Sequence, residues 1–103
     1  MKIHELKLDS KFWNDVRSGI KTFEIRKNDR KFKVGDVIAL TMYSGTFSSY
    51  ASPTVNGHDY VSQSEAPTMF YDITYITDYE QKEGYVVMSI IPSSQVENIK
   101  GQF

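Results

Sequence analysis

A short run of charged residues is the part of this sequence best suited to chemistry. Glu24 and Arg26 stand two residues apart in a stretch that alternates apolar and polar side chains, and Lys21 precedes them. If the stretch is a strand, Thr22, Glu24 and Arg26 share one face. Such a face can accept a hydrogen bond from a base and hold a phosphate through charge-assisted bonds. The pattern predicts a site for a polar or anionic ligand such as a nucleotide.

The apolar residues of the same stretch, Phe23 and Ile25, are then expected to point into a core. The alternative is an ordinary amphipathic strand whose exposed ion pairs have no function, because such pairs are common and weak. Between residues 21 and 33 there are six Lys or Arg residues, including Arg30, against two acidic ones. This patch either attracts phosphates or is a solvated loop. Asn28 lies within it as a further candidate ligand contact.

Regular elements are needed to position these side chains, and their patterns are clear over most of the chain. Asp9 or Ser10 can cap a helix over 9–18 that Gly19 ends, and this helix leads into the strand over 21–27. Val34-Gly35-Asp36 is typical of a tight turn. Further strands are expected over 3–8, 37–42, 69–77 and 85–91, and Val96 with Ile99 indicates a short C-terminal helix. The pattern predicts an α+β, mainly β fold built as a small barrel.

The segment 44–67 differs from the rest in composition. It contains no Lys or Arg, many Ser, and the aromatic residues Phe47, Tyr50 and Tyr60. We expect a loop insertion that is either a mobile flap or a functional loop. Its aromatic residues either stack on a base or fix the loop to the rest of the fold. Tyr75 and Tyr85, in the later strands, are further candidates for stacking on an unpaired base.

Composition limits the classes of function. The 103 residues predict a single domain over 1–103, and the net charge of −1 argues against a wholly basic polyanion binder. The chain has no Cys, which excludes disulfides and thiolate chemistry. No apolar run is long enough for a membrane span, and the first residues lack a secretory signal, so we expect a cytoplasmic protein. The two His residues have no metal-ligand spacing, and no cofactor is predicted.

Four motifs, taken in order, resemble the ASCH domains of the PUA-like superfamily, closest to the short ASCH-like proteins of bacteria and their phages. They are His4-Glu5-Leu6-Lys7-Leu8, Gly19-x-Lys21-Thr22-Phe23-Glu24-Ile25-Arg26-Lys27-Asn28-Asp29-Arg30, Val34-Gly35-Asp36 and Glu83-Gly84-Tyr85-Val86-Val87. The likeness runs from about residue 2 to 91, interrupted by 44–67. It implies a β-barrel flanked by helices, with a cleft lined by the second motif, and RNA as the partner.

The resemblance leaves a second function open. One ASCH branch hydrolyses acetylated cytidine with a threonine nucleophile, where this sequence has Glu24. A carboxylate beside Arg26 is poorly suited to that role, and Thr22 lies two positions away. An amidohydrolase acting on a modified nucleoside, with Lys21 and Glu24 as acid and base, is therefore the alternative to an RNA- or nucleotide-binding domain. A third alternative is a phage or host accessory protein whose 44–67 loop contacts another protein.

Overall fold

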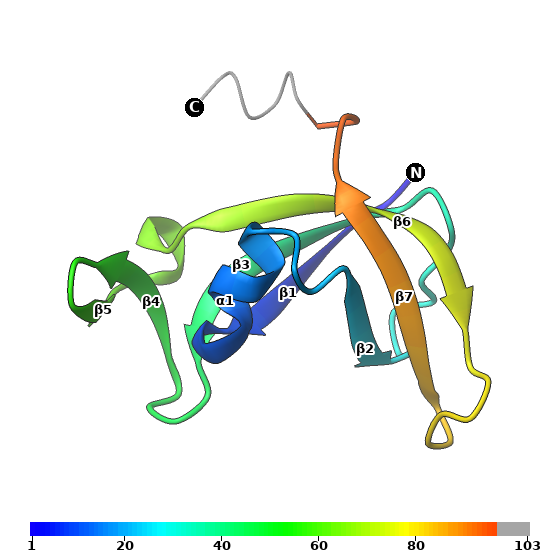
Figure 1. Ribbon diagram of the computed structural model, residues 1–103, viewed down its shortest axis with the longest axis horizontal. Coiled ribbons are helices and arrows are strands. Elements are labelled where there is room, and N and C mark those ends of the chain that lie inside the picture. The colour runs from blue at the N-terminus through cyan, green and yellow to red at the C-terminus, as the bar shows by residue number, and fades with distance from the viewer. Residues whose placement is uncertain (97–103) are drawn as a thin grey trace. The chain divides into compact units, whose positions relative to one another are not determined.

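The structure is a computed structural model that describes residues 1–96, and its fold is mainly β with one α-helix in that range (Figure 1). This confirms the predicted α+β, mainly β class. The strands are β1 (Ile3–Asp9), β2 (Phe23–Lys27), β3 (Val37–Ser44), β4 (Ser49–Thr54), β5 (Gly57–Tyr60), β6 (Thr68–Thr77) and β7 (Tyr85–Pro92). The helices are α1 (Ser10–Arg17) and the single 3-10 turn η1 (Gln63–Glu65).

The strands hydrogen-bond in the order β2-β7-β6-β3-β4-β5, and β1 pairs with β3. Within residues 1–96 this order has two ends, so the sheet is not closed into the barrel that we expected. The reason is that strand-turn-strand patterns indicate antiparallel neighbours but carry no information on whether the first and last strands meet. The predicted C-terminal helix around Val96 and Ile99 extends beyond the described residues.

Residue contacts divide the chain into two compact units. The first unit, called unit 1 below, contains residues 1–4, 22–38 and 70 onwards. The second, called unit 2, contains residues 5–21 and 39–69. No helix in the described part of the chain is long and apolar enough to cross a membrane.

Unit 1 is built on antiparallel pairing of β7 with β2 on one side and β6 on the other. Phe23 of β2 lies opposite Ser89 of β7, and Ser89 lies opposite Tyr75 of β6. The β6–β7 register shifts between Ile73 and Tyr75, which marks a bulge. The apolar side chains that are buried in this unit are Phe32, Val37, Ile38, Tyr71, Ile73, Val86, Met88, Ile90 and Val96.

The predicted tight turn of unit 1 is confirmed. Gly35 has a φ of +93°, a conformation that glycine adopts without steric cost, and the N–H of Asp36 donates to the carbonyl of Lys33 at 3.0 Å. The N–H of Gly35 also donates to the carbonyl of Ile73 at 2.9 Å. The turn is therefore fastened to β6 as well as closed on itself.

Unit 2 holds the helix that was predicted before β2. The Asp9 side chain accepts a hydrogen bond from the N–H of Lys11 at 3.0 Å, as an N-cap should. Gly19, at a φ of +82°, follows the last turn, and Trp13 and Val16 are buried. The helix and its cap follow the sequence prediction.

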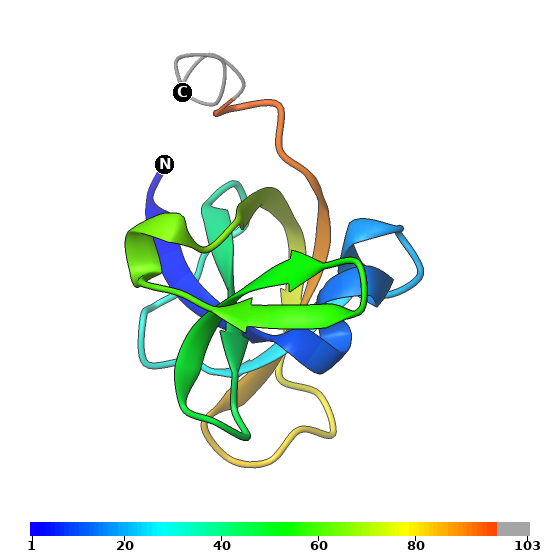
Figure 2. The ribbon, with the colours of Figure 1, turned by 90° about the vertical axis from the view of Figure 1, so that its left-hand side faces the viewer.

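The segment 44–67, expected as a loop insertion, contains regular structure in unit 2. Figure 2 shows β4 and β5 as a hairpin, with Ala51 opposite Tyr60 in the register. The rings of Phe47 and Tyr60 lie 5.1 Å apart, and those of Tyr43 and Tyr50 lie 5.2 Å apart. These contacts agree with the alternative in which the aromatic residues fix the segment in place. A short strand with Pro53 in it gave too little pattern for the hairpin to be predicted.

Candidate functional site

Glu24 and Arg26 form a hydrogen-bonded ion pair on β2, as their spacing predicted, but on the opposite side from the one expected. Arg26 donates to Glu24 Oε1 from Nε at 3.0 Å and from Nη2 at 2.8 Å. Glu24 is only 3% exposed, whereas Phe23 is 41% and Ile25 is 52% exposed. The prediction that Phe23 and Ile25 enter the core and that the charged face stays in water is therefore wrong.

The register of β2 on β7 explains the reversal. Glu24 lies opposite Met88 and Arg26 opposite Val86, and both partners are buried. Residues directly opposite each other in an antiparallel pair point to the same face. The carboxylate therefore enters the protected side of the sheet, where the guanidinium satisfies it.

Thr22 and Lys21, which were predicted to share a site with this pair, lie in different surroundings. The carbonyl of Thr22 accepts a hydrogen bond from the N–H of Ile90 at 3.1 Å, which continues the ladder ahead of β2. Lys21 belongs to unit 2, where its ammonium lies 5.2 Å from the centre of the Phe12 ring. The convergence of Lys21 with Glu24 and Arg26 around one cleft stays a prediction.

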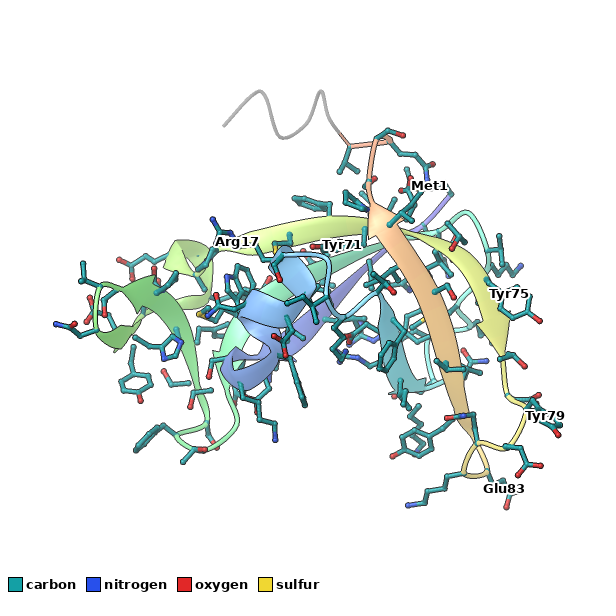
Figure 3. All side chains as sticks on the ribbon, viewed as in Figure 1. Met1, Arg17, Tyr71, Tyr75, Tyr79 and Glu83 are labelled. Carbon is teal, nitrogen blue, oxygen red and sulfur yellow. The ribbon has the colours of Figure 1, made fainter. Side chains whose placement is uncertain are left out.

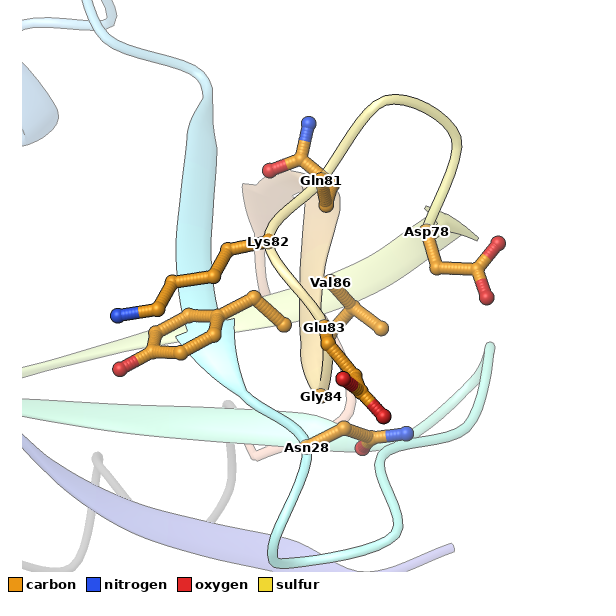
Figure 4. Close-up of a pocket in the computed structure, with 8 residues that line it drawn as sticks. Asn28, Asp78, Gln81, Lys82, Glu83, Gly84 and Val86 are labelled. Carbon is orange, nitrogen blue, oxygen red and sulfur yellow. The ribbon is translucent and has the colours of Figure 1, made fainter.

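Asn28 has a structural role in the turn after β2. Its side-chain oxygen accepts from the N–H of Phe32 at 3.1 Å, and its own N–H donates to the carbonyl of Gly84 at 2.8 Å. Asn28 also lines a pocket of about 360 Å³ together with Tyr85 and residues of the 78–84 turn. Figure 4 shows Lys82 and Asp78 of that turn pointing away from each other.

A second pocket of unit 1 gathers positive charge around Arg30. It has a volume of about 540 Å³, and its lining includes Lys2, Arg30 and Lys31 against one carboxylate, Asp29. We call it the basic pocket. Lys31 has a φ of +51°, an uncommon conformation for a residue with a side chain. Strained backbone of this kind is found disproportionately at ligand sites.

The wall of the basic pocket is fixed by a buried carboxylate. Asp36 accepts from His4 Nε2 at 2.8 Å, and His4 itself lines the pocket. The backbone N–H groups of Lys2 and Lys33 also donate to Asp36, at 3.1 and 3.2 Å. Burial opposes ionisation of Asp36, but these hydrogen bonds outweigh it, and the pKa of Asp36 is lowered from 3.8. One carboxylate thus ties β1 to the loop that carries Arg30 and Lys31.

The two predicted stacking residues lie on the same outer face of unit 1. Tyr75 is 61% exposed, and Figure 3 shows it projecting from β6. Tyr85 of β7 is partly exposed, and the ammonium of Lys82 lies 5.5 Å from the centre of its ring. The register places both tyrosines on the face of Phe23 and Ile25.

Residues 3–90 match a family described as a domain of unknown function, DUF3850. The chain belongs to the DUF3850 family. The region shared with that family runs from β1 into β7 and so includes the Glu24–Arg26 pair and the residues that line the basic pocket, apart from Lys2. A comparison with curated proteins finds no match.

Sequence reasoning missed Lys2, His4 and Asp36 as parts of a site in this DUF3850 chain. One signal for His4 was present, because it alternates with Leu6 and Leu8 and therefore shares their buried side of β1. No spacing rule connects Lys2 with Arg30, because they are far apart in the chain and share a pocket only in the folded protein.

Proposed function

We propose that this domain binds RNA or a nucleotide and holds a phosphate of that ligand in the basic pocket. The observation that carries the proposal is the grouping of Lys2, Arg30 and Lys31 in one open pocket of about 540 Å³. Clustered Lys and Arg side chains attract phosphate groups through charge-assisted hydrogen bonds. The whole chain has a net charge of −1, so the attraction is local to this pocket.

The construction of the pocket supports a binding role over that of a solvated loop. A loop that only carried charges for solubility would need no fixed geometry. Here Asp36 holds both the start of β1 and residue 33 through hydrogen bonds, and Asn28 holds residue 32. The cations are thus presented from a backbone that is already ordered, which lowers the entropic cost of binding.

The resemblance to ASCH domains supports the same ligand class, and we infer that the Lys21, Glu24 and Arg26 motif contributes to it. Glu24 fixes the guanidinium of Arg26 through two hydrogen bonds. An Arg side chain in one orientation is a better donor to a base or phosphate than a mobile one. Lys21 is the group whose contribution most needs a direct test.

Binding of a fluorescein-labelled single-stranded RNA, followed by anisotropy, tests the proposal. The variants Arg30→Glu and Lys31→Glu should each weaken binding about tenfold, because each replaces attraction of a phosphate by repulsion. Lys11→Glu makes the same charge change on α1, in unit 2, and should alter the Kd less than twofold. The change in Kd caused by Lys21→Ala and by Glu24→Gln then shows whether the predicted cleft contributes to binding.

The proposal fails if the wild-type protein binds neither the RNA nor a nucleoside monophosphate at micromolar to millimolar concentrations. It also fails if Lys11→Glu weakens binding as much as the pocket variants, since the attraction would then be diffuse. Equal losses in Lys21→Ala, Glu24→Gln and Lys11→Ala would have the same meaning for the predicted cleft, because Lys11 lies on α1 outside the motif.

A further inference from the structure

The outer face of β2, β7 and β6 carries a row of three residues that are directly opposite one another. Phe23 of β2 faces Ser89 of β7, and Ser89 faces Tyr75 of β6. A small hydroxyl side chain therefore separates two aromatic rings. The neighbouring row places Ile25, Val87 and Thr77 side by side on the same face.

This face is open although it is rich in rings. Phe23 is 41%, Ile25 is 52% and Tyr75 is 61% exposed, and Ser89 between the rings is exposed as well. On β2 a carboxylate is buried on one side of the strand while apolar side chains stay exposed on the other. This is the reverse of the usual arrangement, and contiguous exposed apolar surface often marks a binding site. The arrangement is more easily understood if a planar ligand covers it.

We propose that Phe23 and Tyr75 hold one unpaired nucleobase between their rings, above Ser89. This inference rests on the proposed function, and it names the ligand as single-stranded RNA. Adjacent strands lie about 4.8 Å apart, so the backbones of Phe23 and Tyr75, two strands apart, are separated by about 10 Å. The two side chains can lean towards each other over Ser89 and contact both faces of a base, at the ring-centroid distances of about 4.5–7 Å that interacting aromatic groups adopt. Ser89 leaves the space that a larger residue would fill.

The charges around the face favour nucleic acid over a protein partner. Lys27 follows Phe23 and Ile25 on the same face, opposite Tyr85, whose ring is also beside Lys82. The one carboxylate of this face in the paired rows, Asp72, already accepts hydrogen bonds from Ser93 at 2.6 Å and Gln95 at 2.9 Å. Ser89 and Thr77 also interrupt the apolar surface, whereas the centre of a protein interface is typically continuous and apolar.

The 78–84 turn limits the direction in which an RNA backbone can leave the face. It contains the carboxylates Asp78, Glu80 and Glu83 against one cation, Lys82. Phosphates are repelled from such a turn and attracted along β2 towards Lys27 and the loop of Arg30 and Lys31. The base slot and the basic pocket thus lie in the same unit, with cationic residues of the chain between them.

Fluorescence of 2-aminopurine placed in a short single-stranded RNA tests the slot, because stacking on a ring quenches this base. Tyr75→Ala should weaken binding about tenfold and remove the quenching. Ser89→Leu should do the same by filling the slot while leaving both rings in place. Tyr75→Phe keeps the ring and should bind within twofold of wild type. Tyr79→Ala, an equal truncation in the exposed 78–84 turn, is the matched control and should leave both readouts unchanged.

The outcomes separate this inference from the proposed function. If Arg30→Glu weakens RNA binding but Tyr75→Ala and Ser89→Leu do not, the slot is wrong and the basic pocket stands. Tighter or equal binding of a fully paired duplex also overturns the slot, because no base is then available to insert. Light scattering that shows a dimer of the wild type and a monomer of Ser89→Leu would assign the face to a second copy of the chain instead. Far-UV circular dichroism confirms that each variant is folded.

Discussion

At the scale of single residues, Asp36 is the side chain that makes the most hydrogen bonds around the basic pocket. It accepts hydrogen bonds from His4 and from the N–H groups of Lys2 and Lys33. A carboxylate can only accept, so His4 must carry a proton on Nε2 in this pair. The residue was noticed in the sequence only as part of a turn, yet it positions one wall of the basic pocket.

Asp36 gives a pH-dependent prediction with a definite sign. The pKa of Asp36 is lowered in the folded protein by the bonds from His4, Lys2 and Lys33, which outweigh burial. The stabilisation is therefore complete above the ordinary value of 3.8 and disappears as the pH falls through the lowered pKa. Asp36→Asn should lose about 2 kcal/mol of unfolding free energy at pH 7 and converge with wild type at low pH.

Urea unfolding at a series of pH values from neutral to acidic checks this expectation. Asp59→Asn, on the exposed hairpin strand β5, is the control and should unfold at nearly the wild-type urea concentration throughout. A constant difference between wild type and Asp36→Asn at every pH would contradict the assigned cause.

At the scale of the element, β2 shows that an alternating strand can present either side to the core. The ion pair of Glu24 and Arg26 makes the protected side tolerable for charge, and the outer side keeps Phe23 and Ile25. An edge strand that exposes apolar residues is also a place where another molecule can add to the fold. We propose RNA as the occupant of the outer face because of the rings beside Ser89 and the cations Lys27 and Lys82 beside Tyr85.

A pair of substitutions on β2 tests which side is buried. Glu24→Ala removes the partner of a partly buried guanidinium and should destabilise the domain by about 2–3 kcal/mol. Ile25→Ser should cost less than about 1 kcal/mol, because half of this side chain is in solvent. Urea or thermal unfolding gives both values. The reverse order of the two losses would mean that Ile25, and not Glu24, faces the core.

At the scale of the whole molecule, the contrast between a net charge of −1 and a local group of cations has a measurable effect. Association with RNA should be salt-sensitive to the extent that phosphates contact the cations of the basic pocket and of β2, since the net charge of the whole chain offers no general attraction. This distinguishes the domain from proteins whose whole surface is basic.

Salt titration of RNA binding gives the number of such contacts. For three cations on a single strand, the logarithm of the association constant should fall with the logarithm of salt concentration with a slope of about −2. Lys31→Ala should make the slope shallower by about 0.7, whereas Lys11→Ala on α1 should leave it unchanged. A slope near zero for the wild type would exclude phosphate contacts as the source of affinity.

Local patterns were sufficient for most elements of the fold. The capping side chain of Asp9 and the glycine at position 19 marked both ends of α1, and the turn at Gly35 was visible from its residue types. The hairpin of β4 and β5 was missed because its two strands are short and largely polar, and because Pro53 interrupts the first of them. Its strands are defined by pairing with each other and not by an apolar pattern.

For the candidate site too, local patterns predicted some features and only the tertiary structure decided the others. The sequence alone determined that Glu24 and Arg26 share a face, because side chains alternate strictly along a strand. It did not determine which face is buried, because an alternating pattern has the same period in either orientation. That choice came from pairing Glu24 with Met88 and Phe23 with Ser89. Tertiary structure also decided that Lys2 joins Arg30 and Lys31, since the hydrogen bonds of Asp36 bring together segments far apart in the chain.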